Sequence, residues 1–214
     1  MIENNKNPVL LVHGIYNTSA KFNTMTNYLT HLGWSVHGVS LKPNNGDGHL
    51  EHLAEQVHDY INNNFDPQQP IDLIGFSMGG LVTRYYLQRL GGVEKVQRYI
   101  NISTPNNGTI TAYVLANPGI KQMRPNSQFL QDLNEDLEIT LNKIDVTVIW
   151  TPYDLMIFPA SSSKIAIGEE IKLPVLTHEQ MVTNEKLLKT ISDTLSKPLK
   201  ISKYRLNCKK TKLL

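Results

Sequence analysis

The sequence contains a single cysteine, Cys208, among 214 residues, and this scarcity excludes two kinds of architecture. One cysteine cannot form an internal disulfide or a multi-cysteine zinc site. The sequence also lacks the run of about 20 apolar residues that a transmembrane helix needs. Its first residues, MIENNKNPVLLVHG, have no basic segment, long apolar core or small-residue cleavage site of the kind found in signal peptides. We therefore expect a cytoplasmic protein.

Nucleotide-binding motifs are absent as well. Neither the G-x-G-x-x-G pattern nor the P-loop pattern occurs in the sequence. We therefore expect no cofactor, and the residues suggest no metal site.

Charge is unevenly distributed along the chain. Seven of the 21 Lys and Arg residues, but none of the 19 Asp and Glu residues, lie in residues 197–214, so the rest has 14 bases against 19 acids. A mildly acidic body argues against nucleic acid as a partner. We expect residues 197–214 to form a basic tail that solubilises a monomeric protein. The alternative is that the tail makes peripheral contact with an anionic membrane surface.

Short apolar runs alternate with segments of helical periodicity. We expect buried strands at residues 8–13, 34–41, 71–76, 96–103 and 144–151, and a weaker one, interrupted by Pro174, at 171–176. Helices are expected at residues 20–31, 50–61, 78–90 and 183–196. This alternation predicts an α/β fold with a mostly parallel sheet and helices on both faces.

We expect residues 1–196 to form a single domain. The longest interval between its predicted strands, residues 104–143, follows the fourth strand and has three short helical patterns. Connections of this length inside a compact domain are usually functional. We therefore expect the segment to be an insertion over the active site.

The most informative motif is Gly75-Phe76-Ser77-Met78-Gly79, a G-x-S-x-G pattern between a predicted strand and a predicted helix. In this context a serine sits on a tight strand-to-helix turn that exposes its hydroxyl, and the glycines allow the backbones to approach. The pattern predicts that Ser77 is a nucleophile.

A second motif, His13-Gly14, ends the first strong strand. The loop after such a strand supplies one backbone N–H to an oxyanion hole, and the residue after the nucleophile supplies the other. We expect these donors to be the amides of Ile15 and Met78. The side chain of His13 is expected to be a buried core histidine at the end of the strand.

The two remaining catalytic residues must follow the serine in the order acid, then histidine. Asp154 lies just past the end of a predicted strand, and His178 is the only histidine after Ser77. The sequence therefore predicts a catalytic triad of Ser77, Asp154 and His178.

Over residues 8–196 the sequence resembles the lipases and esterases of the α/β-hydrolase superfamily, particularly the small class that includes the minimal Bacillus-type lipase. Besides the two motifs above, residues 103–109 (STPNNGT) are similar to the family's S-T-P-H-x-G-T segment. Residues 129–134 (FLQDLN) are similar to its F-L-x-x-L-N segment. Two positions depart from the pattern, because Phe76 and Asn106 stand where the family often has histidine.

The resemblance implies an α/β-hydrolase fold and hydrolysis of carboxylic esters, most simply of lipids as in a triacylglycerol lipase, through an acyl-enzyme on Ser77. The substrate would be a small-molecule or lipid ester, and no cofactor is implied. Two alternatives stay open. The same triad could serve an acyltransferase or thioesterase, and a hydrolase scaffold can also serve as a non-catalytic binding protein.

Overall fold

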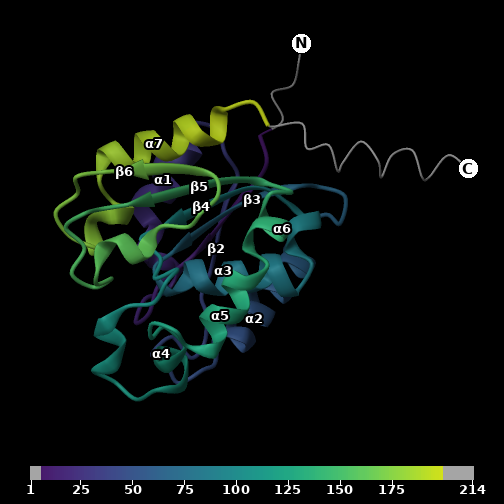
Figure 1. Cartoon of the computed structure of the whole chain (residues 1–214). Coiled ribbons are helices and arrows are strands. Elements are labelled where there is room, and N and C mark those ends of the chain that lie inside the picture. Colours follow the sequence, from purple (N-terminus) through teal and green to yellow (C-terminus); the bar gives the residue numbers. More distant parts are fainter. Residues whose placement is uncertain (1–5, 200–214) are drawn as a thin grey trace, which may run out of the picture.

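The computed structural model describes residues 6–199, so the predicted tail from residue 200 onward, with Cys208, lies outside the described residues. Within them, one parallel six-stranded sheet has the order β2-β1-β3-β4-β5-β6 (Figure 1). The expected α/β fold is confirmed. The strands are β1 (Val9–Val12), β2 (Val36–Val39), β3 (Ile71–Phe76), β4 (Val96–Ile102), β5 (Asp145–Trp150) and β6 (Glu169–Lys172).

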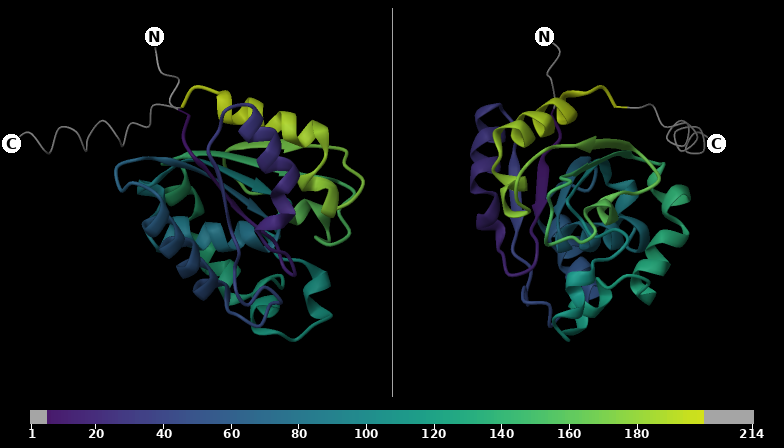
Figure 2. Two further views of the ribbon diagram at one scale, coloured as in Figure 1. Left: turned by 180° about the vertical axis from the view of Figure 1, so that it is seen from behind. Right: turned by 60° about the vertical axis from the view of Figure 1, so that its left-hand side comes forward.

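Helices cover both faces of this sheet, as Figure 2 shows. Two helices, α1 (Asn23–His31) and α7 (Glu185–Ser196), pack on one face. The opposite face is covered by α2 (Leu50–Asn64) and α3 (Met78–Arg89), and by two helices of the long β4–β5 connection, α5 (Gln128–Glu135) and α6 (Leu137–Leu141). A further short helix in this connection is α4 (Pro118–Gln122).

The layers explain why the strands appear in the sequence as continuous apolar runs. Alternate residues of a strand face opposite sides of a sheet. In β1, Leu10 and Val12 face the layer of α2 and α3, whereas Val9 and Leu11 face the layer of α1 and α7. All four are completely buried, which is typical of parallel sheets covered on both faces.

The sixth predicted strand, residues 171–176, is placed wrongly. The structure has β6 at Glu169–Lys172, and its mostly exposed EEIK sequence carries no apolar run. Pro174 cannot donate a ladder hydrogen bond, so the sheet ends before it. The helices predicted within residues 104–143 also do not include α4.

The order of the strands indicates where a ligand would bind. From the adjacent strands β1 and β3, the chain continues outward in opposite directions, to β2 on one side and to β4 on the other. In open α/β sheets, ligands bind at the carboxyl ends of strands at such a switch point. Among residues 6–199, no helix has both the length and the apolar character needed to cross a membrane.

Candidate active site

Ser77 lies on a sharp turn between β3 and α3. Its backbone has φ 55° and ψ −128°, in the region that residues other than glycine rarely adopt. The tight turn requires glycine on both sides. A Cβ atom on Gly75 would lie 2.5 Å from Thr83 Oγ1, and one on Gly79 would collide with the carbonyl oxygens of Val12 and His13. The glycines therefore allow the turn to pack against both its own helix and β1.

Asp154 and His178 form a buried hydrogen-bonded pair. His178 Nδ1 lies 2.7 Å from Asp154 Oδ2, and the two residues are 4% and 2% exposed. The other carboxylate oxygen, Oδ1, accepts hydrogen bonds from the amides of Met156 at 3.0 Å and Ile157 at 2.9 Å. A carboxylate held in this way keeps the proton of a neutral imidazole on Nδ1 and leaves Nε2 as a base.

The imidazole of His178 lies beside the turn that carries Ser77. Its ring packs against the ring of Phe76, the residue that immediately precedes Ser77. The structure thus pairs Asp154 with His178 and places His178 against the residue that precedes Ser77, at the carboxyl edge of the sheet. Among the described contacts, none joins Ser77 Oγ directly to His178. The catalytic roles of the three residues remain a prediction.

Gly14 lies directly against Ser77. A Cβ atom on Gly14 would be 2.9 Å from Ser77 Cβ and 3.3 Å from Ser77 Oγ. The peptide unit that joins Gly14 to Ile15 is therefore next to the hydroxyl, where an oxyanion donor is expected. Met78, the other expected donor, is the first residue of α3 and completely buried. At this position its amide is one of the helix's unpaired N-terminal donors.

His13 fixes the orientation of that peptide unit. Its Nε2 accepts a hydrogen bond from the amide of Leu41 at 2.9 Å, so Nδ1 carries the proton and donates to the Gly14 carbonyl at 2.8 Å. In a trans peptide the C=O and N–H bonds point in opposite directions. Holding the Gly14 carbonyl therefore directs the Ile15 amide away from the imidazole. Burial lowers the pKa of His13, which keeps the ring neutral.

The next residues of this loop are held by the segment after β2. Tyr16, whose φ is 59°, donates its amide to the Asn44 carbonyl at 2.7 Å. The side-chain amide of Asn44 donates to the Asn17 carbonyl at 2.7 Å. Sequence analysis missed this role of Asn44, because the segment 42–46 has the composition of an ordinary loop.

Two threonines of the β4–β5 connection brace the loop that carries Asp154. Thr111 Oγ1 donates to the Met156 carbonyl at 2.6 Å, and Thr109 Oγ1 accepts from the Phe158 amide at 2.8 Å. The amide of Ile110 donates to the Phe158 carbonyl at 2.9 Å. Thr109 belongs to the STPNNGT segment, so the resemblance pointed to this segment without indicating its partner.

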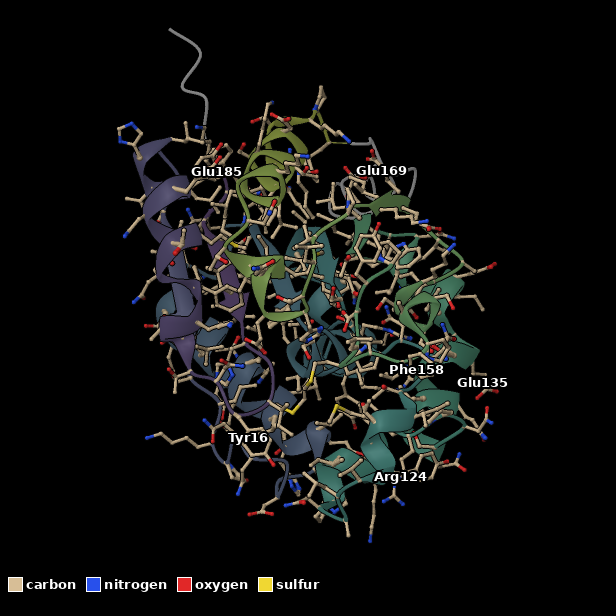
Figure 3. All side chains as sticks on the ribbon, turned by 90° about the vertical axis from the view of Figure 1, so that its left-hand side faces the viewer. Tyr16, Arg124, Glu135, Phe158, Glu169 and Glu185 are labelled. Atoms are coloured by element: carbon tan, nitrogen blue, oxygen red, sulfur yellow. The ribbon has the colours of Figure 1, made fainter. Side chains whose placement is uncertain are left out.

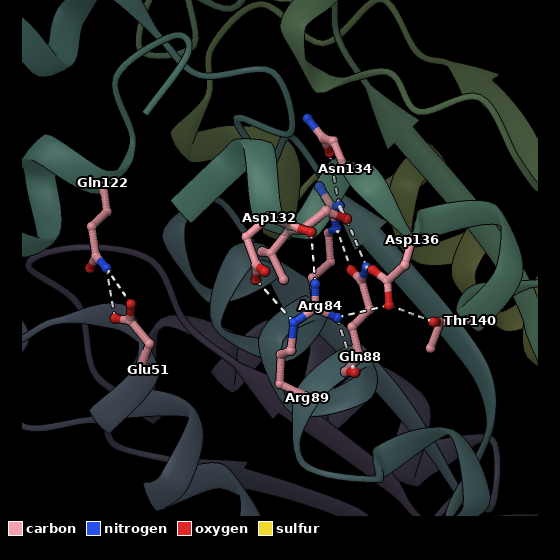
Figure 4. Close-up of polar contacts among 10 residues, drawn as sticks. Glu51, Arg84, Gln88, Arg89, Gln122, Asp132, Asn134, Asp136 and Thr140 are labelled. Carbon is pink, nitrogen blue, oxygen red and sulfur yellow. Dashed lines mark hydrogen bonds and ion pairs between the residues drawn. The ribbon is translucent and has the colours of Figure 1, made fainter. Parts of the chain in front are cut away.

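A buried arginine connects the helix of Ser77 to the helices of the insertion (Figure 4). Arg84 in α3 is completely buried and donates to Asn106 Oδ1, the Leu133 carbonyl and Asn134 Oδ1 at 3.2, 2.7 and 2.9 Å. Burial lowers its pKa to about 10, so the guanidinium remains charged at neutral pH. Asn106 thus fills the position of the family's histidine with a neutral acceptor.

Two further polar side chains, also drawn in Figure 4, fasten the insertion. Arg89 in α3 forms ion pairs with Asp132 at 3.0 Å and Asp136 at 2.8 Å. Gln122 in α4 donates to both carboxylate oxygens of Glu51 in α2, at 2.8 and 2.6 Å. The helices of the insertion are therefore tied to the two helices that cover the same face of the sheet. Across residues 6–199, no cluster of three metal-ligating side chains is formed.

Comparison with known proteins identifies a family and a fold. The model of the palmitoyl protein thioesterase family matches residues 8–121, which is more than half of the chain. Lipase B of Aspergillus fumigatus superposes with a TM-score of 0.79 at 20% identity, covering 92% of this chain and 54% of that one. This chain therefore spans about half the length of the fungal lipase.

Two shorter proteins match over almost their whole length. The mature form of a Bacillus licheniformis lipase has a TM-score of 0.72 at 14% identity, covering 89% of this chain and 92% of the lipase. Polyneuridine aldehyde esterase has a TM-score of 0.64 at 16% identity, covering 88% and 99%. These likenesses confirm the α/β-hydrolase fold that the motifs predict.

Proposed function

The chain belongs to the palmitoyl protein thioesterase family, and from this premise and the geometry we propose that it is a serine hydrolase of carboxylic esters acting through Ser77. The observation that carries the proposal is the buried Asp154–His178 pair beside a serine with a strained backbone. A strained residue on a strand-to-helix turn is retained where the strain serves function. An acid, a base and a serine in this arrangement are the parts of an acyl-transfer site.

In the first half of the reaction, Ser77 Oγ attacks the carbonyl carbon of the ester while His178 Nε2 takes the hydroxyl proton. The carbonyl oxygen becomes an oxyanion, which the amides of Ile15 and Met78 stabilise by hydrogen bonds. When the intermediate collapses, the carbon–oxygen bond to the alcohol breaks and His178 returns the proton to the leaving oxygen. The product is an ester of Ser77.

In the second half, His178 takes a proton from water, and the resulting hydroxide attacks the acyl carbon. Collapse of the second intermediate breaks the bond to Ser77 Oγ, which recovers its proton from His178. Asp154 stabilises the imidazolium in both halves and keeps its orientation. The reaction needs only water and the ester.

The finer proposal is lipase-like activity on lipid esters with apolar acyl chains. It is supported by the likeness in fold to lipases from Aspergillus fumigatus and Bacillus licheniformis. A thioester substrate is the second candidate, and the match to the palmitoyl protein thioesterase family favours it. The acyl-enzyme is the same for both, so the two differ in the leaving group alone.

The first test is labelling with a fluorophosphonate probe, which reacts with an activated serine whatever the substrate. Wild type should be labelled at Ser77, and Ser77→Ala and His178→Ala should not be labelled. His31→Ala is the matched control, because His31 is an exposed histidine at the end of α1. Folded wild type that stays unlabelled would overturn the proposal in favour of a non-catalytic binding protein.

The second test separates the two candidate substrates. Rates of hydrolysis are compared for an oxygen ester and a thioester with the same acyl chain, over a series of chain lengths. A kcat/KM that is higher for the oxygen ester at every length supports the lipase-like proposal. A higher value for the thioester supports the second candidate. Faster acyl transfer to an added alcohol than to water would assign an acyltransferase instead.

A further inference from the structure

The short helix α4 of the insertion is joined to the chain after β2, at residues 44–50, which we call the 44–50 segment. Figure 1 shows α4 at the lower end of the molecule. The helix begins with Pro118, which has no N–H, so the Gly119 amide is its first donor without an acceptor inside the helix. This amide donates to the Gly46 carbonyl at 2.9 Å. A Cβ atom on Gly119 would lie 2.3 Å from the Gly48 carbonyl oxygen, so the two backbones are in direct contact.

Both ends of α4 hold the 44–50 segment. Just before the helix, the side-chain amide of Asn117 donates to Asp47 Oδ1 at 2.5 Å. In the last residue of the helix, Gln122 Oε1 accepts a hydrogen bond from the Leu50 amide at 2.7 Å. Leu50 is the first residue of α2, so this bond also satisfies one of the free N-terminal donors of that helix. The segment is therefore fixed to α4 along most of its length.

The 44–50 segment in turn holds residues 13–17, the loop that carries one of the expected oxyanion donors and that we call the oxyanion loop. Asn44 binds this loop twice. Its carbonyl accepts a hydrogen bond from the Tyr16 amide, and its side-chain amide donates to the Asn17 carbonyl, both at 2.7 Å. Asn44 therefore fixes the two residues that follow the expected donor, Ile15.

Gly46 is in contact with both α4 and the oxyanion loop. A Cβ atom on Gly46 would lie 2.5 Å from Ile120 Cγ1 in α4 and 3.2 Å from Ile15 Cδ1. The φ angle of Gly46 is 86°, a conformation that glycine adopts without strain. A displacement of α4 would therefore be transmitted to Ile15 by packing as well as by hydrogen bonds.

The oxyanion loop needs such support because its backbone is strained. Tyr16 has a φ of 59°, which residues other than glycine keep only where their surroundings impose it. Figure 3 labels Tyr16 and, shortly after the end of α4, Arg124, both in the lower half of the molecule. The contacts of Asn44 hold the backbone on both sides of the Tyr16 α-carbon. Without them we expect Tyr16 to relax to a negative φ and to displace the amide of Ile15.

The position of α4 is itself fixed from the side of the predicted acid. The carbonyl of Met123, which follows the last residue of α4, accepts a hydrogen bond from the Thr109 amide at 2.9 Å. Thr109 Oγ1 in turn accepts from the Phe158 amide, in the loop that carries Asp154, at 2.8 Å. Both Ile120 and Met123 are buried. The helix therefore connects the loop of Asp154 to the oxyanion loop.

We propose that Asn44 and Gly119 are positioning residues for the oxyanion hole. Gly119 fixes the 44–50 segment to α4, and Asn44 fixes the oxyanion loop to that segment, so that the amide of Ile15 stays beside Ser77. The inference rests on the proposed function, because it concerns the support of one donor in that reaction. It gives the insertion a part in stabilising the transition state, in addition to the expected part in covering the site.

The test measures kcat and KM for p-nitrophenyl butyrate and the rate constant of fluorophosphonate labelling. Asn44→Ala removes the side-chain bond to the oxyanion loop, and the Cβ of Gly119→Ala would push α4 away from the 44–50 segment. Each variant should lower kcat and the labelling rate by about ten- to a hundredfold, because a displaced donor keeps part of its effect. KM should change by less than about twofold, since the oxyanion forms only in the transition state.

Matched controls change the same residue types at the amino edge of the sheet. Asn64, at the end of α2, also donates its side-chain amide to a backbone carbonyl, that of Tyr60, at 2.8 Å. Gly92 is also buried, and a Cβ atom on it would lie 2.5 Å from the ring of Tyr86. Asn64→Ala and Gly92→Ala should leave kcat and the labelling rate unchanged, even where the melting temperature falls. Thermal unfolding verifies that every variant is folded.

A double-mutant cycle separates positioning from a purely structural role. His13 orients the peptide unit of the same donor, so a donor already displaced by His13→Ala has little left to lose. Asn44→Ala should therefore cost less than about twofold in kcat in the His13→Ala background. A residue that supports the fold alone would lower kcat by the same factor in both backgrounds.

Three results would overturn the inference. They are rates of Asn44→Ala equal to those of wild type, equal losses in both backgrounds of the cycle, and losses in the controls as large as those in Asn44→Ala and Gly119→Ala. Each of them is compatible with a wild type that is labelled at Ser77, and each leaves the proposed function standing. Folded wild type that stays unlabelled overturns the proposed function itself, so the two failures are distinguishable.

Discussion

The ring of Phe76 lies against the ring of His178, with the two centroids 4.8 Å apart and the planes inclined by 33°. Phe76 is the last residue of β3, whereas His178 follows β6 at the far edge of the sheet. Both side chains are almost completely buried. The contact therefore holds the expected base next to the expected nucleophile, although β4 and β5 separate the two strands.

We predict that Asp154→Asn lowers kcat by roughly four orders of magnitude and leaves the fold intact. Asparagine can still accept the two backbone hydrogen bonds at Oδ1, but its NH2 group cannot accept a hydrogen bond from His178 Nδ1–H. The imidazole then takes the wrong tautomer, for which a loss of about 10⁴ is typical. Steady-state kinetics measure kcat, and thermal unfolding tests whether the fold is intact. The control is Asp193→Asn, which changes an exposed aspartate in the same way. A loss below about tenfold would show that Asp154 is not the acid.

His13→Ala should lower kcat by about 10²–10³, because the Gly14–Ile15 peptide loses the hydrogen bond that orients it. That range is typical of the loss of one oxyanion donor. KM should change little if the amide acts on the transition state alone. A variant with unchanged kcat and reduced stability would indicate a purely structural histidine. Thermal unfolding is recorded in parallel, since the unpaired Leu41 amide is expected to cost about 1–3 kcal/mol.

The same histidine predicts a dependence of stability on pH. Burial lowers the pKa of His13 below the value of 6.5 of the unfolded chain. Below that pH the unfolded state binds more protons than the folded state, so this stability contribution is present above pH 6.5 and lost as the pH falls. When the pH is lowered from 7.5 to 5.5, the melting temperature of His13→Asn should therefore fall less than that of wild type. Equal losses in both proteins would contradict this prediction. Burial also lowers the pKa of His37, which acts in the same direction in both proteins.

Two glycine substitutions should separate activity from stability. The Cβ of Gly14→Ala would meet Ser77 Cβ at 2.9 Å and displace the hydroxyl, so we expect a loss of kcat with a small change in melting temperature. The Cβ of Gly79→Ala would meet the backbone of β1, which cannot move aside, so we expect a loss of about 1–3 kcal/mol of stability. Urea unfolding and kinetics on both variants test this contrast. If the two variants lost kcat and stability to the same extent, the prediction would be refuted.

Arg84→Ala should destabilise the protein by about 3 kcal/mol or more. The substitution removes a charged donor from the buried Asn106 Oδ1 and from the Leu133 carbonyl, and opens a cavity. Urea unfolding measures the change in the free energy of unfolding. Lys189→Ala, which removes an exposed ion pair with Asp193, should cost below about 1 kcal/mol. A similar cost for both variants would show that the network of Arg84 contributes no special stability.

Much of the sheet could be predicted because strands buried on both faces leave an uninterrupted apolar run in the sequence. This holds for β1, β3 and β5, which lie inside the sheet. It fails for β6, because an exposed edge strand can be polar throughout. The burial of Arg84 could not be predicted either. An arginine within a helix normally marks the solvent side, and three of the acceptors that satisfy this one lie some 20 to 50 positions away along the chain.

The candidate site was predictable to the extent that its chemistry is local. The turn of Ser77 is specified by neighbouring glycines, and the order of acid and histidine leaves few choices. The supports of the site are distant contacts to backbone atoms, such as Leu41 to His13 and Met156 to Thr111. Backbone carbonyls and amides are common to almost all residue types, so these contacts cannot be predicted from the residue types in the sequence.

The amino edge of the sheet determines how the molecule could be attached to a support. Asn7 donates to Asp72, the Lys197 carbonyl accepts from Arg98, and Asp72 and Arg98 form an ion pair with each other. Residues near both ends of the described chain thus meet at one point, on the edge opposite to Ser77. A tether joined to the protein on this side would leave the edge that carries Ser77 facing away from a bead or electrode.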